Sequence, residues 1–168
     1  PGRSTSTLRS RYSVRDRSSA RPRKRISLRS SSTSNGPTAG GGAAMLTSPG
    51  LPDLAIDAPA EFDGPGDKWS PETLLTGAVA DCFVLTFRAV AAASKLEWKA
   101  VRCDVEATLE RVDNVTRFSR FELNVRLTVP SGTDDARARR IIEKAERSCM
   151  VTNSLVGERH LHAEIEQA

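Results

Sequence analysis

The stretch SPETLLTGAVADCFVLTFRAVAAA, residues Ser70–Ala93, decides the fold of this chain. Ser70 suits the N-cap of a helix, Pro71 suits its first position, and Glu72 complements the helix dipole there. Beyond these residues, apolar side chains cover most of the circumference of the helix. A helix of this kind is buried, either in a protein core or in a membrane.

This helix approaches the length of a membrane span, but it contains Asp81 and Arg88. Each charge costs about 2.5–3.5 kcal/mol near the centre of a bilayer. The whole chain has 27% charged and 38% hydrophobic residues, a composition typical of a globular domain. We therefore predict a central helix in a single globular domain, with no membrane contact.

Charge is unevenly distributed along the 168 residues. Residues 1–30 hold ten basic residues and one acid, Asp16, so the remaining 138 residues carry −5 of the overall net charge of +4. Residues 1–25 have almost no apolar side chains and are predicted to be a disordered basic extension of a domain spanning 26–168. A transit segment, an arm for nucleic acid or anionic surfaces, and an extension from an uncertain start site all fit this composition. Tyr12 is its only aromatic residue, which argues against nucleic-acid binding.

Alternating side chains predict most of the strands. Short apolar pieces at 26–31, 43–47 and 54–56 lie between glycine- and proline-rich turns and indicate a small meander. Residues 97–110 and 121–129 alternate apolar and polar side chains, which predicts an antiparallel hairpin with one polar face.

A second, amphipathic helix is predicted after the hairpin, with Thr133 or Asp134 as its cap and Cys149 at the end of its apolar face. A last strand follows around His160–Ile165. This order of elements predicts an α+β fold with both helices on one face of an antiparallel sheet.

The three cysteines are too few for a disulfide framework and fit a reducing compartment. Cys82 and Cys149 each lie on the apolar side of a helix, and both helices pack on the same sheet in the predicted fold. Core packing explains both residues, and so does a redox-active pair whose Cα atoms approach within about 7 Å. Cys103 points inward on a regular strand and is predicted to be a core residue.

A reactive Cys82 has to be a thiolate, whereas burial raises the pKa of a thiol. A reactive cysteine here therefore requires a nearby cation held by a carboxylate. Glu72 is a candidate for that carboxylate, but ten helical residues separate it from Cys82 by about 15 Å. Joint action requires a segment that folds back or a second subunit.

Other candidate sites are less specific. His160, His162 and Glu164 alternate on one strand and have the chemistry of metal ligands, but a solvated face explains them better. Gly40-Gly41-Gly42 lacks the residues of a phosphate-binding loop. We predict neither a metal nor an organic cofactor.

Two motifs resemble the signatures of the OsmC/Ohr family of organic hydroperoxide reductases. They are SPETLLTGAVADCF at 70–83 and AERSCMVTNSL at 145–155, within a match of about residues 40–168. The resemblance implies an OsmC-like α+β fold, with antiparallel sheets packed on two central helices. It also implies an intertwined homodimer with active sites at the subunit interface.

The resemblance further implies roles for three residues. Cys82 matches the peroxidatic cysteine and Cys149 the resolving cysteine, while Glu72 matches a glutamate that pairs with a thiolate-stabilising arginine. That arginine has no counterpart that we can align here. The implied partners are an organic hydroperoxide, held by apolar walls, and a thiol or dithiol reductant such as lipoamide.

The leading hypothesis is therefore a cytoplasmic, thiol-dependent hydroperoxide reductase that acts in oxidative-stress defence. The alternative is an OsmC-like protein that binds a small apolar ligand and has little or no peroxidase activity. A third hypothesis, association with nucleic acid through the basic arm, rests on residues 1–30 alone.

Overall fold

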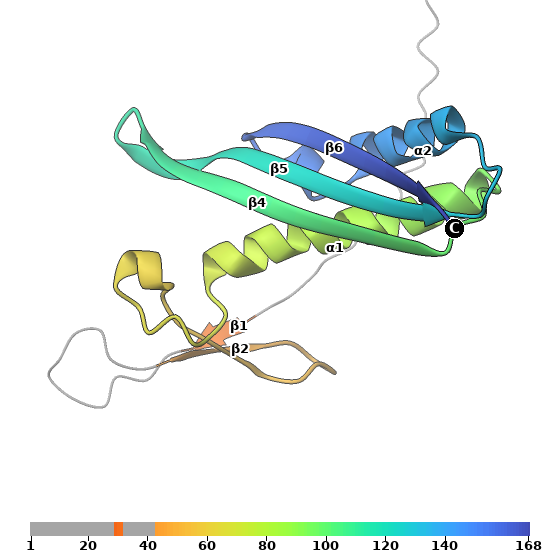
Figure 1. Cartoon of the computed structure of the whole chain (residues 1–168). Helices are drawn as coiled ribbons and strands as arrows, with labels where there is room; N and C mark the ends of the chain where they lie inside the picture. The colour runs from red at the N-terminus through yellow and green to blue at the C-terminus, as the bar shows by residue number, and fades with distance from the viewer. Residues whose placement is uncertain (1–28, 32–42) are drawn as a thin grey trace, which may run out of the picture.

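The computed structural model describes residues 29–31 and 43–168. Two helices and two three-stranded sheets form an α+β fold (Figure 1). The predicted extension at 1–25 and the glycine-rich turns before residue 43 lie outside the described residues. The elements follow the order β1 (Arg29–Ser31), β2 (Ala44–Thr47), β3 (Leu54–Ile56), η1 (Ala60–Phe62), α1 (Pro71–Ala93), β4 (Ala100–Val112), β5 (Val115–Val129), α2 (Asp135–Ser148), η2 (Thr152–Ser154) and β6 (Glu158–Gln167).

The strands β1, β2 and β3 form a small antiparallel sheet in that order, which confirms the predicted meander for the described residues. Gly50 has a φ of 79° in the turn before β3, a conformation that glycine adopts without steric cost. A bridge between Ile56 and Trp69 leads the chain towards α1. The small sheet stands beside the first turns of α1, apart from the larger sheet (Figure 1).

Helix α1 begins as its sequence predicts. Ser70 Oγ accepts a hydrogen bond from Thr73 N at 3.2 Å, and Thr73 Oγ1 accepts one from Ser70 N at 2.8 Å, which completes a capping box. Four residues of α1 are fully buried, but Leu85 on another face is 60% exposed. The expectation that the helix is buried nearly all round is therefore wrong for the single chain. The buried residues are Val79, Phe83, Phe87 and Ala91.

Among the described residues, α1 is the one helix that is long and apolar enough to cross a membrane. One side of the helix packs against β4 and α2.

The larger sheet has the strand order β4-β5-β6. β4 and β5 form the predicted antiparallel hairpin, turning at Asp113 and Asn114, whose φ values of 51° and 63° suit a two-residue connection. β6 runs parallel to β5, with Leu161 opposite Leu123. The expectation of a wholly antiparallel sheet is corrected here, because α2 forms a crossover that lets β6 enter in the direction of β5.

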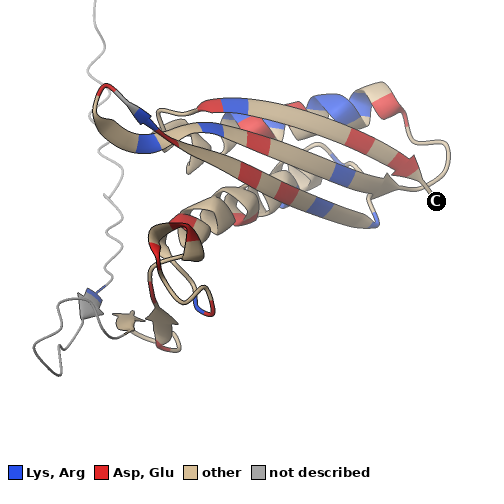
Figure 2. Ribbon diagram, turned by 60° about the vertical axis from the view of Figure 1, so that its left-hand side comes forward, with Lys and Arg blue, Asp and Glu red and all other residues tan. Residues whose placement is uncertain are grey.

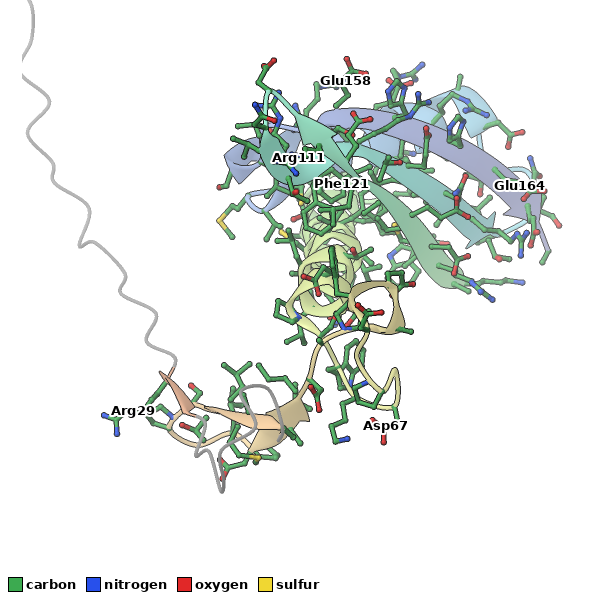
Figure 3. All side chains as sticks on the ribbon, turned by 90° about the vertical axis from the view of Figure 1, so that its left-hand side faces the viewer. Arg29, Asp67, Arg111, Phe121, Glu158 and Glu164 are labelled. Carbon is green, nitrogen blue, oxygen red and sulfur yellow. The ribbon has the colours of Figure 1, made fainter. Side chains whose placement is uncertain are left out.

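Helix α2 takes Asp134 as its cap: the carboxylate accepts hydrogen bonds from Ala136 N at 2.9 Å and Arg137 N at 3.3 Å. Its apolar residues are buried against α1 and β6. Both helices cover the same face of the larger sheet (Figure 1), and the side chain of Phe121 lies on this helix side (Figure 3).

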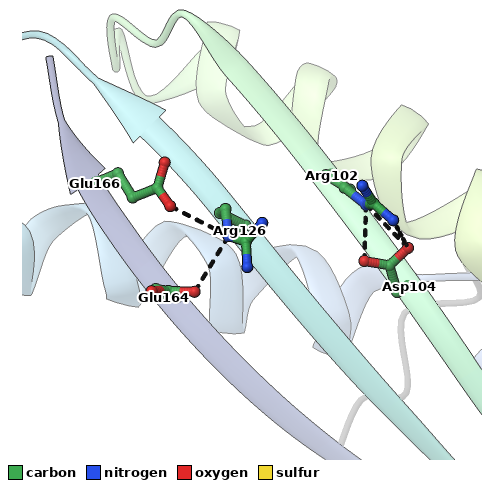
Figure 4. A network of polar contacts seen from close by, with 5 residues as sticks. All are labelled: Arg102, Asp104, Arg126, Glu164 and Glu166. Carbon is green, nitrogen blue, oxygen red and sulfur yellow. Dashed lines mark hydrogen bonds and ion pairs between the residues drawn. The ribbon is translucent and has the colours of Figure 1, made fainter.

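The other face of the larger sheet carries charges of both signs (Figure 2). Arg126 Nε lies 3.2 Å from Glu164 and 3.1 Å from Glu166, and Arg102 pairs with Asp104 at 2.8 Å (Figure 4). Exposed pairs of this kind add little to stability. The charged face is therefore a solvated surface, and the chemistry must be sought on the helix side.

Candidate active site

The two helices bring Cys82 and Cys149 together. Cys82 is half-buried near the middle of α1, and Cys149 is fully buried directly after the last residue of α2. Both are free thiols, and the Cys149 S–H donates a hydrogen bond to the Cys82 sulfur. The packing of α2 on α1 thus makes one thiol pair from two distant parts of the chain.

Hydrogen bonding sets the charge state of Cys82. Burial raises the pKa of this thiol, but donors to the sulfur outweigh burial and lower the pKa below its usual value. They are the backbone N–H of Val151, the Cys149 thiol, the Thr86 hydroxyl and the backbone N–H of Met150. Within the described part of the chain, no cationic side chain is among the causes of this shift. The site therefore stabilises a thiolate with oriented dipoles.

The pKa of Cys149 shifts the other way. Burial raises it, and the hydrogen bond that its thiol gives to Cys82 raises it further. The hydroxyl and backbone amide of Thr152 act in the opposite direction without reversing the shift. The opposite pKa shifts therefore favour ionisation of Cys82 over ionisation of Cys149.

Sequence reasoning missed the donors around Cys82. Thr86 lies one helical turn beyond Cys82, with its hydroxyl 4.0 Å from the sulfur, so helical spacing contained that signal. The amides of Met150 and Val151 carry no such signal, because every residue except proline has a backbone N–H.

Cys103 behaves as the core residue predicted from its strand. It is half-buried on the inner face of β4, and burial raises the pKa of its thiol to about 12. The neighbouring charges of Asp104 and Cys149 raise it further. Cys103 therefore stays a neutral thiol at physiological pH.

Glu72 lies in the first turn of α1, and the single chain does not bring it to Cys82. Both residues belong to the same continuous helix, about 15 Å apart along its axis. Glu72 Oε2 is buried and has no hydrogen-bond partner among the described residues. A buried carboxylate oxygen without a donor is costly, so this group fits a donor from outside the described part of the chain.

An open pocket of about 580 Å³ borders Glu72. The apolar walls that the family resemblance implies are Phe83, Phe87 and Leu75. None of them lines this pocket, and Phe83 and Phe87 are fully buried in the core of the chain. Different residues make the walls of this pocket, because the first turn of α1 faces η1 and the β4–β5 hairpin. Its apolar lining comes from Pro59, Phe62, Ala107, Leu109 and Phe118.

The histidines of β6 do not form a metal site. His162 Nε2 lies 2.9 Å from Glu122 Oε2, and His160 Nε2 lies 3.4 Å from Glu158 Oε2. No group of three or more potential metal ligands occurs in the described ranges.

Comparisons with known proteins place this chain. The model of the OsmC-like protein family matches residues 64–165. The uncharacterized protein YmaD of Bacillus subtilis (strain 168) is 31% identical over 113 residues, which are 66% of this chain and 75% of that protein.

Solved structures share the fold. An OsmC-like protein of unknown function from Vibrio cholerae has a TM-score of 0.73 at 14% identity, over 84% of this chain and 100% of the other. An organic hydroperoxide resistance protein from Elizabethkingia anophelis has a TM-score of 0.66 at 18% identity, over 86% and 99%. One from Legionella pneumophila has a TM-score of 0.59 at 23% identity, over 86% and 99%.

These matches define the class as α+β proteins with the OsmC-like fold. The chain belongs to the OsmC-like protein family, as the motifs around Cys82 and Cys149 indicated.

Proposed function

We propose that this protein reduces organic hydroperoxides, with Cys82 as the attacking thiolate and Cys149 as the resolving thiol. The Cys82 sulfur attacks the O–O bond and becomes a sulfenic acid, while the departing alkoxide takes up a proton and leaves as an alcohol. The Cys149 thiol then attacks the Cys82 sulfur, water leaves, and a disulfide forms. A cellular thiol or dithiol, such as lipoamide, reduces that disulfide and restores both thiols.

The observation that carries this proposal is the interaction between the two thiols, whose hydrogen bond helps to shift their pKa values in opposite directions. A nucleophilic cysteine needs a lowered pKa, and Cys82 has one. A resolving cysteine needs to be close and to hold a proton that can leave with the sulfenic oxygen, and Cys149 meets both conditions. No metal or organic cofactor enters this chemistry.

A second copy of the chain completes the proposed site. Glu72 is too far from Cys82 in one chain, and its buried oxygen has no hydrogen-bond partner within residues 29–31 and 43–168. The exposed side of α1 presents Leu85, which is 60% exposed and flanked by the exposed residues Asp81 and Arg88, and offers an apolar contact to a second copy. In the intertwined homodimer that we propose, Glu72 of one subunit contributes to the active site that contains Cys82 of the other subunit.

The family context supports a role in oxidative-stress defence. Two of the structural neighbours are organic hydroperoxide resistance proteins. Three free thiols fit the reducing cytoplasm, which is where we propose that the reaction takes place.

The pocket beside Glu72 favours one other function, the binding of a small apolar ligand without peroxide chemistry. Its volume and apolar lining suit such a ligand. The two functions make different predictions for Cys82: an organic hydroperoxide oxidises this thiol in a reductase and leaves it free in a protein that only binds a ligand.

Mass spectrometry of the thiols during titration with cumene hydroperoxide separates them. We expect one equivalent of peroxide to produce a Cys82–Cys149 disulfide in the wild type and none in Cys82→Ser. The Cys103→Ser variant serves as the matched control and forms the disulfide normally. Free thiols that persist under excess peroxide would exclude the reductase and leave the binding function.

A further inference from the structure

Arg159, at the start of β6, joins three segments around the turn formed by residues 149–154. Its Nε lies 3.6 Å from Glu146 Oε1 in the last turn of α2, and its Nη1 donates a hydrogen bond to Asn153 Oδ1 at 2.8 Å. Asn153 Nδ2 donates in turn to the carbonyl oxygen of Arg147 at 2.9 Å. One guanidinium thus fixes the turn to both α2 and β6.

The Arg159–Glu146 pair is more shielded from water than the pairs on the outer face of the sheet. The Glu146 side chain is 17% exposed and that of Arg159 is 34% exposed, whereas Arg126 is 54% exposed in its pair with Glu164. Partly buried charge pairs are screened less by water and salt than exposed ones.

The turn is also closed from within. The backbone N–H of Asn153 donates to the Cys149 carbonyl oxygen at 3.1 Å, and the Thr152 hydroxyl donates to the same oxygen at 3.2 Å. The Ser154 hydroxyl donates to the carbonyl oxygen of Met150 at 2.8 Å. These bonds make the turn a compact unit, so holding it at Asn153 also holds its first residues.

The first residues of this turn, Cys149, Met150 and Val151, are among the groups that lower the pKa of Cys82. We propose that Arg159 is a positioning residue: it fixes the turn of residues 149–154 against α1 so that the Cys149 thiol and the amides of Met150 and Val151 face the Cys82 sulfur. The guanidinium is directed to Glu146 and Asn153 and acts on Cys82 only through the turn. The relevance to catalysis rests on the proposed peroxide reduction, but the positioning itself does not.

The test is the pH dependence of Cys82 alkylation by iodoacetamide, followed by mass spectrometry on the reduced full-length protein. In Arg159→Ala, we expect the rate at pH 7 to fall at least about threefold and the midpoint of the profile to move to higher pH, because the hydrogen bonds to the thiolate are loosened. Arg126→Ala, which removes an arginine with two ion pairs on the outer face, is the matched control and leaves the profile unchanged.

Arg159→Lys separates positioning from simple charge. Lysine keeps the positive charge but lacks the planar fork that holds Glu146 and Asn153 together. We expect Cys82 in this variant to be alkylated almost as slowly at pH 7 as in Arg159→Ala. A wild-type profile in Arg159→Lys would show that charge suffices and would overturn the positioning role, and so would a wild-type profile in a folded Arg159→Ala.

Asn153→Ala keeps the test decisive if circular dichroism shows that Arg159→Ala is unfolded. This exposed residue receives the Arg159 hydrogen bond, so its loss should move the profile in the same direction. An unchanged profile would overturn the proposal. The alkylation assay uses no peroxide. If the wild type does not react with hydroperoxides, the proposed function is refuted, but the alkylation profiles still test the positioning role of Arg159.

Discussion

The Cys149 thiol donates a hydrogen bond to the Cys82 sulfur, and this contact lowers the pKa of Cys82 while raising that of Cys149. Cys149 thus has two separable properties, because it is a hydrogen-bond donor before it is a redox partner. Substitutions that keep one property and remove the other test the two roles independently.

Cys149→Ala should slow Cys82 alkylation at pH 7 by about tenfold, because a hydrogen bond to a charged group is lost. Cys149→Ser keeps a donor and should alkylate close to the wild-type rate. Both variants should stop at the Cys82 sulfenic acid after peroxide treatment, which a dimedone adduct reports by mass. Equal alkylation rates in the two variants would show that the donor role is absent.

The pH dependence of stability should distinguish Cys103 from Cys82. Burial raises the folded-state pKa of Cys103 from 9.0 to about 12, so its contribution to stability is present in full below about pH 9 and is lost as the pH rises towards 12. The stability gap between wild type and Cys103→Ala, about 1 kcal/mol at pH 7 from the lost packing, should therefore shrink above pH 9.

For Cys82, the stability difference between wild type and the alanine variant should change with pH in the opposite direction. Its folded-state pKa is lowered, so its contribution is present above the unfolded-state pKa and is lost as the pH falls through the folded-state pKa. The gap between wild type and Cys82→Ala should widen with rising pH. Urea unfolding under reducing conditions at several pH values measures both gaps, and gaps that do not change with pH would contradict the assigned shifts.

Local signals explain why much of this fold can be predicted from the sequence. The Ser70 cap, the Asp134 cap and the hairpin turn each depend on residues close together in the chain, and all three occur in the structure. The direction of β6 depends instead on where α2 returns the chain, which is a tertiary property. Periodicity therefore located β6 but assigned it the wrong direction.

The site was less predictable for the same reason. Two cysteines on apolar helix faces are consistent with core packing and also with redox chemistry. Only the packing of α2 on α1 shows that the two thiols interact. The donors from Met150 and Val151 belong to the backbone, where residue identity carries no information. An apolar helix pattern also does not indicate whether the residues that pack against the helix come from the same chain or from another chain.

Leu85→Glu should disrupt the proposed homodimer. Leu85 is 60% exposed on α1 in the single chain, and burying a charge at a subunit interface is strongly unfavourable. We expect light scattering coupled to size-exclusion chromatography to change from a dimer mass to a monomer mass. Val115→Glu, at a residue that is 58% exposed near the hairpin tip, is the control and should remain dimeric. A dimeric Leu85→Glu would place the interface elsewhere.

Mixed dimers should reveal whether Glu72 acts across subunits. Glu72→Gln and Cys82→Ser should each be nearly inactive alone, because one lacks the carboxylate and the other lacks the nucleophile. Dimers that combine the two variants contain one site with both native residues if Glu72 of one subunit serves Cys82 of the other. Random mixing makes about half of the dimers mixed, so co-refolding should restore about a quarter of wild-type peroxide consumption.

The same mixture gives no recovery if Glu72 acts within its own subunit, because every chain then lacks one of the two groups. Co-refolding Cys82→Ser with Cys149→Ser is the matched control, since both thiols lie on the same chain and no mixed site contains the pair. Recovery with Glu72→Gln and none with Cys149→Ser would therefore assign the carboxylate to one subunit and both sulfurs to the other. That result would also fit the Glu72 oxygen that lacks a hydrogen-bond donor in the described part of the chain, because the assembled dimer could supply one.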